Sequence, residues 1–392
     1  MELRDGYKRT DIGVLPEHWD VGVLRDLVDP IRTIRYGIVQ PGNFDPDGRY
    51  MIRGQDYSKG WVAPQEFFRV SRRIEEPFAN ARVIAGDVLI TIVGASTGRI
   101  AVVPAWLDGA NLTQTTARIA PRTNRLDGGF CSYLLASPTG SKQVANYLKG
   151  AAQPGLNCGD LEKFLIPLPS LPEQRAIATA LSDVDTLLDG LERLIAKKRD
   201  LKQATMQQLL TGQTRLPGFH GEWAVKRLGD VLTICHGKGQ RDVEAANGSY
   251  PILATGGQIG TASRALYDMP SVLIGRKGTI NRPQYMETPF WTVDTLFYSM
   301  MKHNNSAKFL FYRFCLVDWM QYNEASGVPS LNARTIESIE VECPEPAEQT
   351  AIAAVLSDMD AELSALEARR NKTRDIKQAM MQELLTGRIR LV

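Results

Sequence analysis

Arginine side chains in glycine-containing turns are the residues of this sequence best suited to specific chemistry. The apolar run Val83–Val93 leads into the turn GASTGR, which ends at Arg99, and Ser271–Ile274 leads into GRKGTINRP, which contains Arg276. Residues 1–165 contain 15 Arg and only 5 Lys. A guanidinium group can donate two parallel hydrogen bonds to a phosphate or to the edge of guanine. The pattern indicates nucleic-acid contact, although a GC-rich coding sequence would produce the same arginine excess.

Long polar side chains in and around such turns are the candidate DNA contacts. For each of them the alternative is a solvated turn residue or one half of a surface salt bridge. In the first half of the chain the candidates are Arg35, Arg53, Gln55, Arg99, Gln114 and Arg118. In the second half they are Lys238, Gln240, Arg241, Arg276, Lys277, Asn281 and Arg282.

The sequence lacks the motifs of a self-sufficient enzyme. The segment Gly94–Arg99 has neither the spacing nor the lysine of a phosphate-binding Walker A loop, and Thr255–Gly260 is a turn rather than a dinucleotide fingerprint. The chain contains no Asn-Pro-Pro-Tyr type tetrapeptide and no GxSxG nucleophile elbow. The four histidines form no HxxxH pair and the five cysteines form no CxxC pair. We therefore expect a non-catalytic chain without a metal site.

Length and composition are those of an ordinary globular protein. The 392 residues are enough for two or three domains with their own cores. No apolar run approaches the ~20 residues of a membrane span, and the N-terminus has no signal-peptide core, so we expect a soluble cytoplasmic protein. The net charge is only +2, which means that any basic surface must be local.

A long internal repeat determines the architecture. Residues 173–216 and 348–391 align without a gap at an offset of 175, and 26 of the 44 aligned pairs are identical. Apolar residues recur in both copies in alternating steps of four and three, which predicts a coiled-coil seam on a long helix. The two sets of seam residues are Ile177, Leu181, Val184, Leu188 and Leu191, and Ile352, Leu356, Met359, Leu363 and Leu366.

The phase of the seam is predicted to shift in the middle of each helix. Lys198 and Thr373 fall where the apolar pattern should continue, and Leu201 and Ile376 are expected to restart it. Each helix is predicted to have about 38 residues, or roughly 57 Å, from a proline-rich start to the glycine of a final LLTG. Acidic residues come early and basic residues late in both copies, so antiparallel packing would place opposite charges side by side.

The predicted fold is α+β, with two strand-rich modules joined by two long antiparallel helices in a pseudo-two-fold symmetric chain. The module edges also correspond, because Trp19 matches Trp223 and Asn157 matches Asn332, whereas the middles differ greatly in sequence. The expected domains are a first recognition module at 1–165, a spacer helix at 166–214, a second module at 215–342 and a second spacer helix at 343–392.

This order of module, helix, module and helix resembles the specificity subunit of type I restriction–modification systems. The resemblance covers essentially the whole chain. It rests on YGIVQPGNFDPDGRYMIRGQD (residues 36–56), on PLPSLPEQRAIATALSDVD (residues 167–185) and on the two LLTG endings that are followed by Arg-Leu. It implies that each module is a target recognition domain for one half of a bipartite, asymmetric DNA sequence. It also implies that the helices are a spacer that sets the gap between the halves.

The resemblance further implies partners and cofactors. Two methyltransferase subunits would dock on the helices, and restriction and motor subunits would join that complex. Adenine-N6 methylation and ATP-dependent DNA cleavage would belong to these partners, which would bind S-adenosylmethionine, ATP and Mg, so this chain would hold no cofactor. The candidate docking residues are apolar side chains of the helices, namely Ile195, Met206, Leu209, Met380, Met381 and Leu384.

Two other classes of protein remain open. A stand-alone bipartite DNA-binding regulator would pair its helices only with each other. Exposed side chains at Ile195, Met206, Met380 and Met381 would favour partner docking instead. A methyltransferase or nuclease in its own right is disfavoured by the missing motifs.

Overall fold

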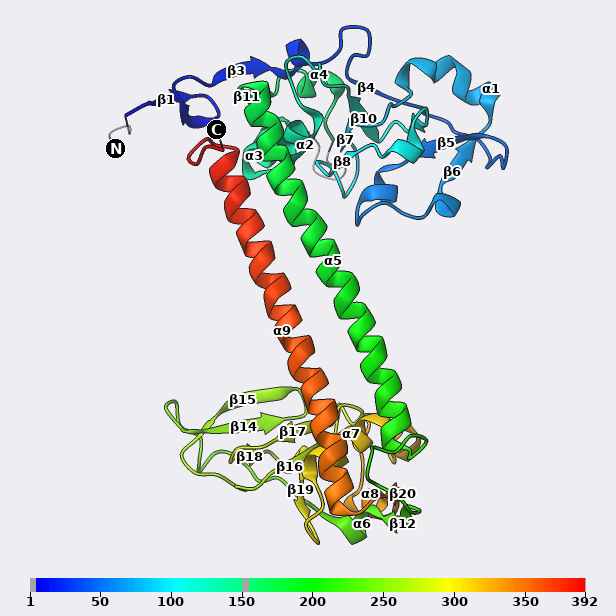
Figure 1. Ribbon diagram of the computed structural model, residues 1–392, viewed down its shortest axis with the longest axis vertical. Coiled ribbons are helices and arrows are strands. Elements are labelled where there is room, and N and C mark those ends of the chain that lie inside the picture. The colour runs from blue at the N-terminus through cyan, green and yellow to red at the C-terminus, as the bar shows by residue number, and fades with distance from the viewer. Residues whose placement is uncertain (1–4, 150–154, 392) are drawn as a thin grey trace. The chain divides into compact units, whose positions relative to one another are not determined.

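The computed structural model describes residues 5–149 and 155–391 (Figure 1). The chain divides into two compact units, Met1–Gly190 with Arg370–Val392, and Leu191–Arg369. Each unit contains one strand-rich module, the first part of one long helix and the last part of the other long helix.

Two long helices dominate the helical content, as the repeat predicts. Helix α5 spans Leu171–Leu210 with 40 residues, and α9 spans Pro346–Leu384 with 39 residues. Gly212 and Gly387 follow them with φ values of 71° and 68°. This left-handed conformation is favourable for glycine and ends a helix, so the prediction from the LLTG motif is confirmed.

The two helices run antiparallel within each unit, as their charge order predicts. In the first unit the ammonium group of Lys377, late in α9, pairs with Asp185, early in α5. In the second unit Lys198, late in α5, lies 2.7 Å from a carboxylate oxygen of Glu362 in α9. Exposed pairs of this kind contribute only about 0–1 kcal/mol each, so they select the orientation more than they stabilise the fold.

The predicted phase shift of the seam is wrong. Leu201 and Ile376 are both 46% exposed, whereas Thr373 is buried. The side chains of Lys198 and Lys202 are only 31% and 21% exposed, and both ammonium groups reach carboxylates of α9. A lysine stem covers apolar surface while its charge stays paired. The seam therefore continues through lysine positions that apolar spacing could not identify.

The first module contains a four-stranded sheet and a three-stranded sheet. Strand β7 is the apolar segment that the sequence predicts, and all four of its residues are buried. In the four-stranded sheet the order is β4 (Arg35–Tyr36), β10 (Thr116–Ile119), β7 (Val88–Thr91) and β8 (Ile100–Val102). In the other sheet β5 (Arg49–Ile52) pairs antiparallel with β6 (Phe68–Val70) and parallel with β9 (Asn111–Leu112).

The second module has the same sheet topology, although its sequence is different. Its four-stranded sheet has the order β13 (Leu232–Cys235), β19 (Leu296–Met301), β16 (Ser271–Gly275) and β17 (Gln284–Met286). Its other sheet pairs β14 (Tyr250–Ala254) antiparallel with β15 (Gly257–Ala262) and parallel with β18 (Trp291–Thr292). The two units therefore repeat one fold.

Short elements close each module on its long helices. The first module has the hairpin β1 (Tyr7–Thr10) and β2 (Gly13–Pro16), the ribbon β3 (Asp20–Val23) and β11 (Leu165–Leu168), and the helices α1 (Arg72–Glu75), α2 (Gly128–Ala136), α3 (Pro138–Tyr147) and α4 (Cys158–Leu161). The second module has the ribbon β12 (Ala224–Arg227) and β20 (Glu340–Cys343), and the helices α6 (Leu228–Val231), α7 (Ala307–Leu316) and α8 (Ala333–Ser338).

The module edges correspond as predicted. Trp19 and Trp223 each lie against the glycine that follows one long helix. Asn157 and Asn332 each cap the short helix that follows them by accepting a backbone N–H bond. These contacts are local to each unit, which is why they can be identified from short matching stretches of sequence.

The glutamine of each repeated Pro-Glu-Gln start joins a long helix to its module. The Gln174 side-chain oxygen accepts a 2.9 Å hydrogen bond from the backbone N–H of Asp127, which caps α2. Gln349 accepts the equivalent 2.9 Å bond from Ser306, which caps α7. Both glutamines are almost completely buried, so each module is held rigidly to the start of one helix.

The glutamate of the same start has a role that its place in the first helical turn does not predict. Glu173 and Glu348 are 1% and 3% exposed. Glu173 pairs with Arg390, and Glu348 pairs with Arg215 at 2.5 and 2.6 Å. Each arginine follows the LLTG end of the other helix. The buried pair therefore joins the start of one helix to the end of the other within one unit.

Candidate nucleic-acid interface

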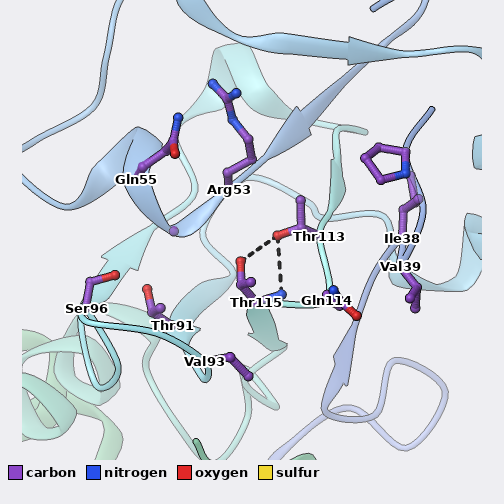
Figure 2. Close-up of a pocket in the computed structure, with 12 residues that line it drawn as sticks. Ile38, Val39, Arg53, Gln55, Thr91, Val93, Ser96, Thr113, Gln114 and Thr115 are labelled. Carbon is purple, nitrogen blue, oxygen red and sulfur yellow. Dashed lines mark hydrogen bonds between the residues drawn. The ribbon is translucent and has the colours of Figure 1, made fainter. Parts of the chain in front are cut away.

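A hollow lined by both apolar and polar side chains lies in the first module, where residues 91–96 meet three other segments. Figure 2 shows Arg53 and Gln55 projecting from the segment after β5, and Gln114 from the loop after β9. The segment after β4 contributes Ile38 and Val39, and the hollow has a volume of about 390 Å³. Gln114 is thus brought close to Arg53 and Gln55, which are far from it in the sequence.

The polar groups of this hollow differ in how firmly they are held. The Arg53 guanidinium donates a 2.8 Å hydrogen bond to the buried carboxylate of Asp56, which fixes its direction. The Gln55 and Gln114 side chains are exposed, and within the described part of the chain no hydrogen bond occupies either amide. An exposed amide can offer one donor and one acceptor to a base edge. The hollow thus carries one fixed cation and two adaptable amides.

The second module has a larger and more highly charged hollow of about 750 Å³. Three candidates line it, namely Lys238, Gln240 and Arg241, and Asp294 lies on the same surface. Arg241 and Lys238 are exposed, whereas the Gln240 amide makes a long 3.4 Å contact with Glu244. A surface with both charge signs can distinguish the donors and acceptors of a base edge while it remains attracted to phosphate.

The remaining candidates with exposed or half-buried side chains lie outside these hollows. Arg35 is on the edge strand β4, and the other candidates lie in the connections between β7 and β8 and between β16 and β17. Arg99 and Arg276 both follow an apolar strand, β7 or β16, but they do not occupy equivalent positions. The backbone N–H of Arg276 bonds to Thr295, as that of Ile92 bonds to Thr115, so Arg276 takes the place of Ile92 and not that of Arg99. The side chains of Arg35, Arg99, Lys277, Asn281 and Arg282 are exposed, and that of Arg276 is half-buried.

Arg118 is not a contact residue, because it is 1% exposed. Its guanidinium donates to the backbone carbonyls of Asn80 at 3.0 Å, Arg82 at 2.6 Å and Thr33 at 3.1 Å. Burial lowers the pKa of the Arg118 guanidinium. All three of its acceptors are backbone carbonyls, and none is a carboxylate. This arginine ties two segments, one at Thr33 and one at Asn80–Arg82, to the four-stranded sheet.

Other arginines of the first module also serve the fold. Glu75 is 1% exposed and accepts two 2.7 Å hydrogen bonds from Arg82. Burial alone would raise the pKa of Glu75, but hydrogen bonds from Arg82 and Asn111 and the charge of Arg49 outweigh it, so the pKa lies below its ordinary value. Part of the arginine excess is therefore explained by buried ion pairs.

The predicted docking residues of the long helices are mostly inaccessible. Ile195, Met206, Leu209 and Leu384 are between 2% and 6% exposed. Met206 and Leu209 belong to the core of the second unit, and Leu384 belongs to that of the first. Met380 and Met381 are partly buried against the first core. The apolar side chains that the helices expose instead are Leu187, Leu194 and Leu201 on α5 and Ile376 on α9.

The three exposed leucines of α5 recur at intervals of seven residues. They are 42%, 39% and 46% exposed, in the order Leu187, Leu194 and Leu201. A seven-residue interval is almost two helical turns, so the side chains share one helix face. We call these three residues the leucine row. Sequence reasoning missed the row because it assigned Leu201 to the seam between the helices.

Within residues 5–149 and 155–391, no group of three or more His, Cys, Asp or Glu side chains is placed to hold a metal ion. No helix in this described part of the chain is both long and apolar enough to span a bilayer.

Comparison with known protein families identifies both modules. The model of the type I restriction modification DNA specificity domain matches residues 16–199 and 220–373. A putative type I restriction enzyme specificity subunit of Methanocaldococcus jannaschii is 25% identical over 99% of this chain and 97% of its own length. The EcoBI specificity subunit of Escherichia coli is 29% identical over 51% of this chain, and the match spans 43% of that subunit.

Solved structures show the same fold. The S subunit of a type I restriction–modification system from M. genitalium has a TM-score of 0.65 and 17% sequence identity, with 98% of each chain covered. A structure from work on the assembly and conformational transition of a type I system has a TM-score of 0.56 and 18% identity, and covers 96% of this chain. At these identities the likeness extends to the fold alone.

Proposed function

The chain belongs to the type I restriction–modification DNA specificity family, and on that basis we propose that it recognises a bipartite, asymmetric DNA target, with one half-site for each unit. The observation that carries this proposal is the combination of one repeated fold with two different hollows. Equal folds present side chains to DNA in the same way, and unequal side chains read different bases. The target is therefore not a palindrome.

The long helices act in this proposal as the spacer between the half-sites. Both are uninterrupted α-helices of 40 and 39 residues, and a buried glutamine joins each of them to a module at its start. A continuous paired helix resists bending far more than a loop of equal length does. The gap between half-sites is thus expected to follow helix length.

The leucine row supports a partner subunit on α5. Exposed apolar side chains repeated along one helix face are unusual on a surface that meets only water. We assign the row to docking of the methyltransferase subunits, in place of the buried positions expected from sequence. In this proposal S-adenosylmethionine, ATP and Mg bind to the partners, which carry out adenine-N6 methylation and ATP-dependent cleavage.

Replacing two leucines of the row by aspartate should abolish methyltransferase docking. We expect the double variant Leu194→Asp and Leu201→Asp to reduce co-purified methyltransferase by more than about ten-fold, because two charges would be desolvated in place of two apolar side chains. The measurement is the subunit ratio after affinity purification of the co-expressed complex.

A matched control is available on the same helix. Ala196 and Gln203 are also seven residues apart, and both are exposed. They lie about 160–180° around the helix from the row. The double variant Ala196→Asp and Gln203→Asp adds the same charge and should retain the partner. If the leucine variant keeps its melting temperature and still co-purifies with the full amount of methyltransferase, the leucine row is not part of the docking surface.

A further inference from the structure

The two hollows lie at the same place in the two modules, because the backbone around them makes the same bonds. In the first module the N–H of Ile38 donates to Leu112 at 2.7 Å, and Thr113 donates to Ile52 at 3.1 Å. In the second module Lys238 donates to Thr292 at 2.8 Å, and Val293 donates to Leu253 at 3.1 Å. In the first module these bonds join the segment after β4 to the parallel strand pair β5–β9. In the second module they join the segment after β13 to the parallel strand pair β14–β18.

A glycine on each side confirms the equivalence. A Cβ atom at Gly37 would lie 2.0 Å from the carbonyl oxygen of Leu112, and one at Gly237 would lie 2.7 Å from that of the equivalent Thr292 and 2.0 Å from that of Val293. No side chain fits at such distances, so both modules require glycine at the same crossing of two segments. The frame around the hollow is therefore constant between modules.

The residue that follows this frame differs between the modules. The frame pairs Thr113 with Val293, so the next residue is Gln114 in the first module and Asp294 in the second. Both side chains are exposed on the hollow surface. Their backbones are held, since the N–H of Gln114 donates to Ile38 at 3.0 Å and the carbonyl of Asp294 accepts from the Arg276 side chain at 3.3 Å. A fixed backbone with a variable, exposed side chain is the arrangement that specificity requires.

We propose that this position reads one base in each half-site, with Gln114 specifying adenine and Asp294 specifying cytosine. The inference rests on the proposed function and adds the residues and the base chemistry. A glutamine amide matches the N6 donor and N7 acceptor of adenine, and a carboxylate accepts a hydrogen bond from the N4 amino group of cytosine.

The carboxylate in the second hollow supports base reading rather than phosphate contact. Asp294 would be repelled by the DNA backbone, so it gains from proximity to DNA only when it accepts a hydrogen bond from a base. Lys238 and Arg241 line the same hollow and supply the attraction to phosphate. The first hollow needs no such balance, because its reading residue, Gln114, is a neutral amide.

Base preference of the two single variants tests the assignment. The full chain is co-expressed with the methyltransferase subunits, and the complex is used to select its preferred duplexes from a library in which both half-sites are randomised. We expect Gln114→Asp to replace an adenine of one half-site by cytosine, and Asp294→Gln to replace a cytosine of the other half-site by adenine. Each change should shift the preference at that base by roughly 5- to 150-fold.

Two controls and one additional variant keep the test decisive. Gln65→Asp and Asp268→Gln make the same exchanges at exposed positions outside both hollows and should leave the selected sequence unchanged. Alanine at position 114 or 294 should flatten the preference at one base only. If the variant complexes assemble but select the same bases as the wild-type complex, the assignment fails. If the wild-type complex selects no bipartite sequence, the proposed function itself fails.

Discussion

Replacing Arg118 by methionine is expected to lower the free energy of unfolding of the first unit by about 2–4 kcal/mol. The substitution keeps a long apolar stem in the core but removes the donors to three backbone carbonyls. Each lost hydrogen bond from a charged group costs about 1.5–3 kcal/mol, and relief of the buried charge offsets part of the sum. The measurement is urea denaturation of the full chain, monitored with a spectroscopic probe placed in the first unit.

Arg35 provides the matched control for this prediction. It is the cross-strand neighbour of Arg118 between β4 and β10, and its side chain is exposed. The variant Arg35→Met should change stability by less than about 0.5 kcal/mol. A loss below about 1 kcal/mol for Arg118→Met would show that water replaces the guanidinium, and would contradict its structural role.

Exchange of residues 30–120 for the same segment of another specificity subunit is expected to change one half-site completely and leave the other intact. The boundaries follow from two backbone hydrogen bonds that close the segment. The N–H of Asp29 donates to the carbonyl of Ala120 at 2.9 Å, and the N–H of Arg122 donates to the carbonyl of Leu27 at 2.8 Å. Helices α2 and α3 stay in place, so the contact of the module with α5 is preserved. Each base contact that is lost costs the original half-site about 1–3 kcal/mol of discrimination.

The reciprocal exchange is the control. Residues 232–301 comprise the corresponding sheets of the second module, from β13 to β19. Their exchange should change only the other half-site. The gap should be the same in both chimeras, because the helices are untouched. A change in both half-sites from either exchange would contradict independent recognition by the two units.

The architecture could be predicted from the sequence where one element repeats a strong local pattern. The four-three apolar spacing, the LLTG stops and the order of charges predict two long antiparallel helices, and the contacts within each unit agree. The seam was mistaken at Thr373 of α9, which is buried, and at Lys198 and Lys202 of α5, where lysines replace apolar residues. Their stems are apolar and their charges are paired across the helices, which a hydrophobicity pattern does not record.

The candidate site could be predicted only in part. Residue type and turn position indicate possible contacts, but whether a side chain is exposed depends on the sheet around it. Arg53, Gln55 and Gln114 meet in one hollow, as do Lys238, Gln240 and Arg241 in the other. Arg118 was misassigned, although it lies in the strand TARI, whose four residues are all buried. Its small and apolar neighbours were a signal that this strand has no face toward solvent.

Single-base mapping of DNA methylation tests the central claim most directly. The chain is co-expressed with its methyltransferase partner in a host without other adenine methylation, and every modified adenine is located. We expect one bipartite, non-palindromic sequence with a fixed gap, methylated on both strands. A complex that forms but methylates a palindrome, or adenines without a common sequence, would contradict recognition of two different half-sites by the two units.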